Sequence, residues 1–233
     1  MRLEINLTLR CQLSCQFCNR ICNLTKNKED YQQEVNIEQI DNLISDLKRT
    51  NTIITKCKVL GGQPTLNKDF VNIWNKIVSV PDLITFVKLE TNHVDPLPII
   101  NLPKHTKIQG RSVGKKHHIP FPWSPKENGI IVKIGDCAQM KRCGYSLSGK
   151  GYLPCSQAIA LCYLLDIDLY KKELPISWTQ EELNLICQHC PENMDKKWKE
   201  QYCNRDIRSF TKEELQLSNL WQECFNNKSV KEY

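Results

Sequence analysis

The sequence predicts an α/β fold built on parallel strands. Apolar and polar residues alternate near the start of the chain, which is the pattern of a half-buried strand. Later apolar runs of strand length are separated by segments whose apolar residues recur at helical spacing. Strands that alternate with helices in this way are joined by right-handed crossovers and run parallel.

Five elements follow one another in residues 1–92. Asn36 precedes the first helical segment and is a good N-cap, and Gly61-Gly62 closes the second strand. The expected elements are a strand at 3–9, a helix at 37–47, a strand at 53–60, a helix at 70–78 and a strand at 83–89.

The pattern weakens after residue 92. Prolines make 94–103 and 117–128 loop-like, while 107–113 and 129–134 are expected to be a fourth and a fifth strand. A last helix is expected from Thr211, where Thr211 and Glu214 fit a capping box. We expect a core at 1–135, a cysteine-rich region at 136–205 and a C-terminal helix at 206–233.

Composition excludes several classes of protein. The chain has 233 residues, a net charge of +6 and a mean hydropathy of −0.46. No stretch approaches the ~20 apolar residues of a membrane-spanning helix, and the first residues lack the pattern of a signal peptide. Basic residues are spread out and form no stripe typical of nucleic-acid binding. We therefore expect a cytoplasmic protein that binds neither membranes nor nucleic acid.

Thirteen cysteines are the unusual feature of the composition. In a cytosolic chain, clustered cysteines bind metal more often than they form disulfides. Cys11, Cys15 and Cys18 follow the first strand directly, and three thiolates at this spacing can hold an iron–sulfur cluster with one iron left open. Cys22 could instead complete a four-cysteine zinc site, and spacing alone leaves both metals open.

A second motif favours the cluster. The second strand ends in Gly61-Gly62-Gln63-Pro64, where two glycines allow a ligand to approach the backbone closely. Exposed amides and carbonyls at such a turn can bind a charged amino-acid head group, which a zinc module does not need.

Together, the CxxxCxxC loop, this turn and Thr91-Asn92 after the third strand resemble the radical S-adenosylmethionine (SAM) superfamily. The resemblance implies a partial, open TIM-like barrel and a 4Fe–4S cluster whose unique iron binds SAM. By analogy, Gly61, Gly62 and Gln63 hold the amino group of SAM. Phe17 packs near its adenine, or is simply a core aromatic. The superfamily usually has glutamate where this chain has Gln63, so a degenerate homologue is an alternative.

A second group of cysteines lies between residues 137 and 203. This region resembles the auxiliary-cluster extensions of the SPASM or twitch type, and a second 4Fe–4S cluster is expected on Cys143, Cys155, Cys187 and Cys190. Cys137 and Cys203 are reserve ligands, and zinc in the same four thiols is the alternative. Cys57 and Cys162 lie in apolar runs and are expected in the core.

The resemblance implies an enzyme that cleaves SAM reductively to a 5′-deoxyadenosyl radical, which abstracts hydrogen from a peptide or small-molecule substrate. A reductant such as flavodoxin or ferredoxin would supply the electron. The alternative is a non-catalytic zinc-binding interaction module.

Overall fold

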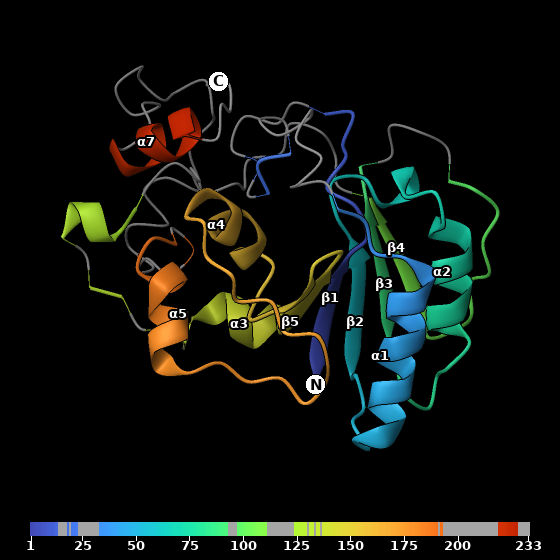
Figure 1. Cartoon of the computed structure of the whole chain (residues 1–233). Helices are drawn as coiled ribbons and strands as arrows, with labels where there is room; N and C mark the ends of the chain where they lie inside the picture. Colours follow the sequence, from blue (N-terminus) through green and yellow to red (C-terminus); the bar gives the residue numbers. More distant parts are fainter. Residues whose placement is uncertain are drawn as a thin grey trace.

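One six-stranded sheet organises the protein, in the order β4-β3-β2-β1-β5-β6 (Figure 1). The computed structural model describes residues 1–13, 18, 20–22, 33–92, 97–110, 124–129, 131–132, 134–135, 137–190, 192 and 219–227. The strands are β1 (Arg2–Asn6), β2 (Lys56–Leu60), β3 (Val87–Thr91), β4 (Thr106–Gly110), β5 (Tyr145–Ser148) and β6 (Gly151–Leu153). The helices are α1 (Ile37–Arg49), α2 (Phe70–Val78), α3 (Ala138–Cys143), α4 (Ala158–Leu164), α5 (Gln180–Cys187) and α7 (Asn219–Asn227). Two short 3₁₀ turns lie at Pro64–Leu66 and Lys126–Asn128.

Strands β4, β3, β2, β1 and β5 all run parallel, and only β6 is antiparallel to its neighbour. The expected alternation of strands and helices in the first part of the chain is therefore confirmed. Among the described residues, β4 and β6 are edge strands, so the sheet is open, in keeping with a partial barrel. Because β5 pairs with β1, the sheet includes residues on both sides of position 135, the expected boundary between the core and the cysteine-rich region.

Helices α1 and α2 cover one face of this sheet (Figure 1). The buried residues beneath them come from alternate positions of each strand, as strand geometry requires. They include Leu3, Ile5, Cys57, Val59, Val87 and Leu89, packed against Leu43, Leu47, Ile73 and Trp74. Asn36 caps α1 as expected. Its side chain accepts a hydrogen bond from the backbone amide of Gln39, and the Gln39 side chain accepts one from the backbone amide of Asn36.

The later elements differ from the sequence expectation. The described residues of 129–134 form no strand: Ile131 is 98% exposed, and Ile134 packs against the apolar cluster around α4 rather than on the sheet. The fifth parallel position belongs instead to β5. Helix α7 confirms a C-terminal helix, although its expected start at Thr211 lies outside the described residues.

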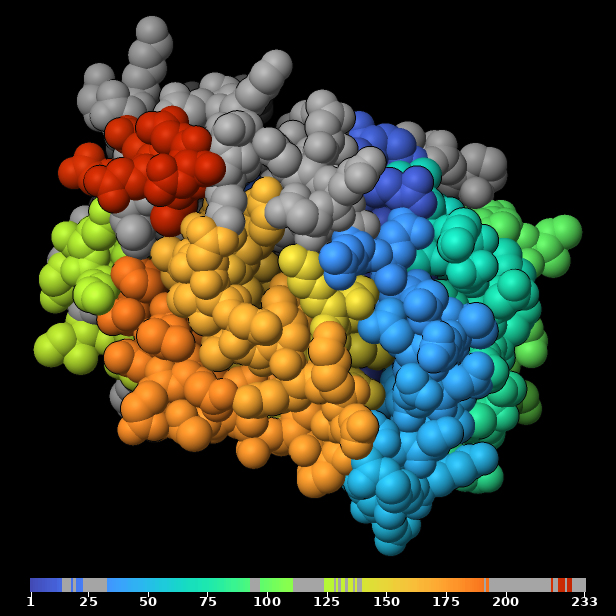
Figure 2. Space-filling view, in the orientation of Figure 1, coloured from blue at the N-terminus to red at the C-terminus, as the bar shows by residue number. Residues whose placement is uncertain are grey.

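A second apolar cluster forms beside the sheet, around the fully buried helix α4. It includes Cys162, and Cys57 is buried in the first core, so both expectations of core thiols are confirmed. Residues 155–190 make up the flank of the molecule that lies beside α1 in the space-filling view (Figure 2). Within the described ranges, no helix combines the length and apolarity needed to cross a bilayer.

Candidate metal centres and cofactor site

The Gly61-Gly62 turn packs directly on the segment that follows β1. The backbone amide of Gly62 donates to the Thr8 carbonyl at 2.8 Å, and that of Gln63 donates to the Arg10 carbonyl at 2.8 Å. A Cβ atom at Gly61 or Gly62 would lie well inside contact distance of these two carbonyl oxygens. Both positions therefore require glycine because another stretch of backbone passes so close. The turn is held against the segment that leads into Cys11.

The carbonyl oxygens of Gly61 and Gly62 accept no hydrogen bond from any described residue, and both glycines are only half-buried. Backbone carbonyls are strong acceptors that need a partner when they are shielded from water. These two oxygens can thus accept from a cation such as an α-ammonium group. The turn thus fits the amino group that the resemblance to the radical SAM superfamily implies.

Gln63 is completely buried, and its side chain links the turn to the end of β3. Its Nε2 donates to the Thr65 hydroxyl at 2.7 Å and lies 2.8 Å from the Thr91 hydroxyl. Its Oε1 accepts from the backbone amide of Asn92 at 3.0 Å. An amide donates and accepts, whereas a carboxylate only accepts, so glutamine suits this mixed set of partners. The Gln63 side chain is thus held by contacts within the protein.

Asn92 connects the turn to the first cysteine. Its Nδ2 lies 3.8 Å from Cys11 Sγ and 3.4 Å from Gln12 Oε1, while Gln63 holds its backbone amide. Cys11, the turn and the end of β3 therefore meet at one edge of the sheet. This is the carboxyl edge of the parallel strands, where open α/β sheets bind their ligands.

Cys18 and Cys22 form a thiol pair. Cys22 donates a hydrogen bond that lowers the pKa of Cys18, and the same bond together with burial raises the pKa of Cys22. Cys18 is thus the thiolate of the pair and Cys22 its protonated donor. The charge of Cys11 also raises the pKa of Cys22, so these three sulfur atoms are neighbours. Cys15 and Phe17 lie outside the described residues.

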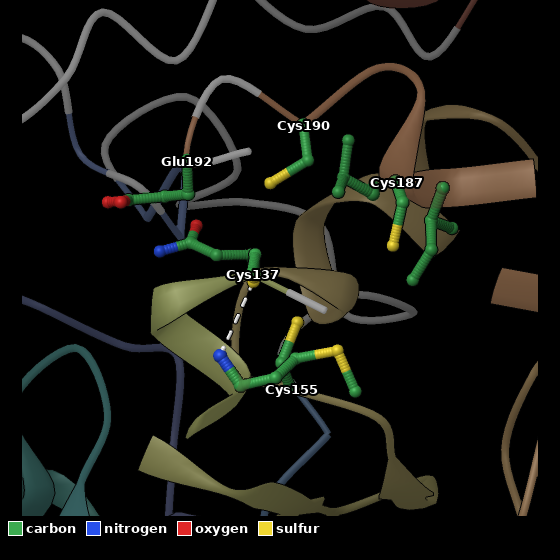
Figure 3. A pocket seen from close by; sticks show the side chains of 9 residues that line it. Cys137, Cys155, Cys187, Cys190 and Glu192 are labelled. Carbon is green, nitrogen blue, oxygen red and sulfur yellow. Dashed lines mark hydrogen bonds between the residues drawn. The ribbon is translucent and has the colours of Figure 1, made fainter. Parts of the chain in front are cut away.

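A second cavity is lined by four cysteines from three separate elements. Cys137 is the N-cap of α3, Cys155 follows β6, and Cys187 and Cys190 lie at the end of α5. Figure 3 shows their side chains around a common space, with Glu192 beside them. Met140, Gln157, Leu161 and Ile186 complete the lining.

These four thiols interact with one another. Burial raises the pKa of Cys155, Cys187 and Cys190, and the charge of Cys137 raises all three further. Buried thiols of this kind become thiolates when a metal compensates the charge, as in structural metal sites. No three of the described His, Cys, Asp or Glu side chains are grouped tightly enough to hold a single metal ion.

Gln157 is the second sign of a ligand in this cavity. Gln157 is 1% exposed, and among the described residues neither its Nε2 nor its Oε1 has a hydrogen-bond partner. Leaving a buried amide unpaired costs about 1–3 kcal/mol, so native proteins rarely tolerate it without a ligand or water. An amide donor beside four thiols fits an iron–sulfur cluster, whose sulfur atoms accept such bonds.

The structure brings together three of the four expected auxiliary ligands, Cys155, Cys187 and Cys190. Cys143 lies elsewhere, with its Sγ 3.1 Å from Lys58 Nζ on the sheet, and it does not line the cavity. Cys137 takes the fourth place, and Cys203 lies outside the described residues. The sequence carried no signal that separates Cys137 from Cys143, or that marks Gln157.

Comparison with known families agrees with the geometry of the first site. The profile of the Radical SAM superfamily matches residues 5–105, so this part of the chain is similar to members of that superfamily. The matched segment contains Cys11, the Gly61-Gly62 turn and strands β2 and β3. Members of the superfamily are enzymes that typically use a 4Fe–4S cluster and SAM. A search of curated proteins finds no match.

Proposed function

We propose that this protein is a radical SAM enzyme that cleaves SAM reductively at the carboxyl edge of its sheet. The observation that supports this most is the contact chain from the Gly61-Gly62 turn through Gln63 and Asn92 to Cys11. It joins a head-group site to the cysteine loop, as SAM must be joined to its cluster. A zinc module has no use for such a chain.

In this proposal Cys11, Cys15 and Cys18 hold a 4Fe–4S cluster, and Cys22 stays a protonated neighbour. When bound and reduced, that cluster would supply the electron for reductive cleavage of SAM to methionine and a 5′-deoxyadenosyl radical, which would abstract hydrogen from the substrate. The chain's own residues bind and orient the cofactor and keep water out.

The carbonyl oxygens of Gly61 and Gly62 accept from the α-ammonium of SAM. Gln63 is a positioning residue, because its amide fixes the turn against Thr91 and Asn92. Phe17 is proposed to pack near the adenine.

We further propose an auxiliary 4Fe–4S cluster in the second cavity, held by Cys137, Cys155, Cys187 and Cys190. This set differs from the spacing-based set by the exchange of Cys143 for Cys137. Two observations support it: the four thiols line one cavity, and the amide of Gln157 in that cavity has no hydrogen-bond partner among the described residues. Four protein ligands would leave no open iron, which favours a role in electron transfer over substrate binding.

The test of catalysis is anaerobic purification followed by iron and sulfide analysis and an assay for 5′-deoxyadenosine with dithionite and SAM. We expect brown protein that forms 5′-deoxyadenosine. Replacing Cys11, Cys15 and Cys18 together by alanine should abolish this product while part of the iron absorbance survives. Colourless, zinc-loaded protein would support the interaction module instead, and an inactive iron protein would support the degenerate homologue.

The test of the second centre is a matched pair of variants, Cys137→Ser and Cys143→Ser. Both are cysteines of the α3 segment, six positions apart. We expect Cys137→Ser to lose about four irons per chain and Cys143→Ser to keep them. The reverse result would restore the set expected from spacing.

The physiological electron donor is proposed to be a flavodoxin or ferredoxin, and the substrate a peptide or a small molecule. Reduction of the cluster by purified flavodoxin, followed by absorbance, tests the first of these proposals.

A further inference from the structure

The face of the sheet that points away from α1 and α2 is unusually polar. Parallel sheets are normally covered on both faces, and their strands are then nearly continuous apolar runs. Here, apart from Leu60 at the end of β2, the alternate residues of β1 to β4 are charged or polar instead. This face, called the polar face below, carries Glu4, Asn6, Lys58, Lys88, Glu90, Lys107 and Gln109.

Three lysines lie side by side on the polar face. The register pairs Lys58 with Lys88 and Lys88 with Lys107, across three adjacent strands. Neighbouring strands are about 4.8 Å apart, so these ammonium groups share one row. Like charges directly opposite each other destabilise a sheet. A row of this kind therefore needs compensating anions.

Two carboxylates compensate part of the row. Glu4 lies 2.5 Å from Lys58 Nζ, and Glu90 lies 2.8 Å from Lys88 Nζ. The side chains of Lys58 and Lys88 are only 13% and 14% exposed, so both pairs are largely shielded from water. Arg20 approaches Glu4 as well, at 3.8 Å, and adds a further positive charge.

Lys107 completes the row without a carboxylate. In the described part of the chain it forms no ion pair, and it is exposed on the edge strand β4. The described side chains of the polar face and its surroundings thus carry more cations than carboxylates. Arg2 and Lys56 lie further along the same face, and Lys107 is the cation of this excess that lies next to Lys88.

We infer that the polar face binds an anionic group of the substrate, a carboxylate or a phosphate, between Lys88 and Lys107. The assignment rests on the proposed function, because it places the substrate below the SAM site. Lys88 precedes Asn92 by four residues, or roughly 13 Å at strand rise. The carboxylate of SAM lies on the same carbon as its ammonium and cannot span that distance from the Gly61-Gly62 turn. The anion is therefore the substrate's own.

The experiment uses the full chain, purified anaerobically with its iron, and inorganic phosphate as the probe. Isothermal titration calorimetry measures phosphate binding at matched ionic strength in chloride. The variant is Lys107→Met, and the matched control is Lys48→Met, an exposed lysine of α1 on the opposite face. Lys107→Met should weaken phosphate binding by roughly tenfold or more, since a hydrogen bond to a charged group contributes that much. Lys48→Met should bind as the wild type does.

A second measurement needs no variant. Acetylation of individual lysines, followed by mass spectrometry, should slow at Lys88 and Lys107 when phosphate is added, and should be unchanged at Lys48. Repeating both measurements with succinate separates the two sources of the anion. Tighter succinate binding assigns a carboxylate substrate, and tighter phosphate binding a phosphorylated one.

Two results would overturn the inference. One is equal phosphate affinity in wild type and Lys107→Met, with no protection at Lys88. The other is loss of phosphate binding when S-adenosylhomocysteine is added, which would make the anion site the cofactor's own. Because binding is measured without turnover, failure of 5′-deoxyadenosine formation would refute the proposed function and leave the anion site standing.

Discussion

Glu4 compensates the charge of Lys58 on the polar face. Replacing it by glutamine should lower the free energy of unfolding by a predictable amount. Its carboxylate is 2% exposed and lies between Lys58 and Arg20, with the Ser156 hydroxyl donating to its second oxygen. Burial opposes its charge, but the two cations, together with the hydrogen bonds from Lys58 and Ser156, outweigh burial and lower the pKa of Glu4 from 4.5 to about 2. Glu4→Gln keeps the shape and removes the charge.

The magnitude follows from that pKa. The difference between 4.5 and about 2 corresponds to about 3 kcal/mol, at about 1.4 kcal/mol per pH unit. Breaking a buried ion pair from one side costs about 3–5 kcal/mol, which agrees. We expect Glu4→Gln to unfold in urea with about 3 kcal/mol less free energy at pH 7. The measurement is equilibrium urea unfolding of metal-free, reduced protein.

The pH dependence of the free energy of unfolding tests whether the Glu4 charge stabilises the protein. A carboxylate whose folded pKa is lowered stabilises the protein fully above its unfolded pKa, and this stabilisation is lost as the pH falls towards the folded pKa. The gap between wild type and Glu4→Gln should shrink from about 3 kcal/mol at pH 7 to about 2 kcal/mol at pH 3.5. The exposed control Asp82→Asn should stay within about 0.5 kcal/mol of wild type. A gap below 1 kcal/mol at pH 7, or one that widens with acid, would refute the reasoning.

Three further changes test other parts of the structure. Gly62→Ala should weaken SAM binding in equilibrium dialysis by more than about tenfold, since its Cβ meets the Arg10 carbonyl, while Gly129→Ala, with open space around it, should not. Gln157→Met should make the metal-free protein about 1 kcal/mol more stable to urea, because it removes a buried unpaired amide. The same change should reduce the rise in melting temperature when the cluster is loaded, and an unchanged rise would contradict a role for the amide. Asn67→Ala should cost about 2 kcal/mol or more in urea, because Nδ2 donates to the Leu7 and Val35 carbonyls at 2.8 Å each; a loss below about 0.5 kcal/mol would contradict this.

The first half of the fold could be predicted because local and long-range signals agree there. The alternation in β1, the capping box at Asn36 and the glycines after β2 each point to the same element boundaries. The run at 129–134 misled the prediction, because an apolar run forms a strand only where a neighbouring strand is available. Tyr145–Ser148 has a weaker pattern but lies beside β1.

The candidate site was likewise predictable in one part and not in the other. Cys11 and Gly61-Gly62 are close in space because the carboxyl ends of adjacent parallel strands meet, which topology alone dictates. The choice between Cys137 and Cys143 depends on which end of α3 faces the cavity. The helix begins at the cavity with Cys137 as its N-cap and ends at Lys58 with Cys143. Spacing carries no information about that direction, nor about the unpaired amide of Gln157.

The thiol pair Cys18 and Cys22 provides the most direct test of the central claim that one iron is left open for SAM. Both cysteines are changed singly to alanine, and 5′-deoxyadenosine formed with dithionite and SAM is quantified for each iron-loaded protein. The proposal predicts that Cys22→Ala still forms 5′-deoxyadenosine and that Cys18→Ala does not. Loss of the product in both variants would make Cys22 a fourth ligand and contradict the open iron.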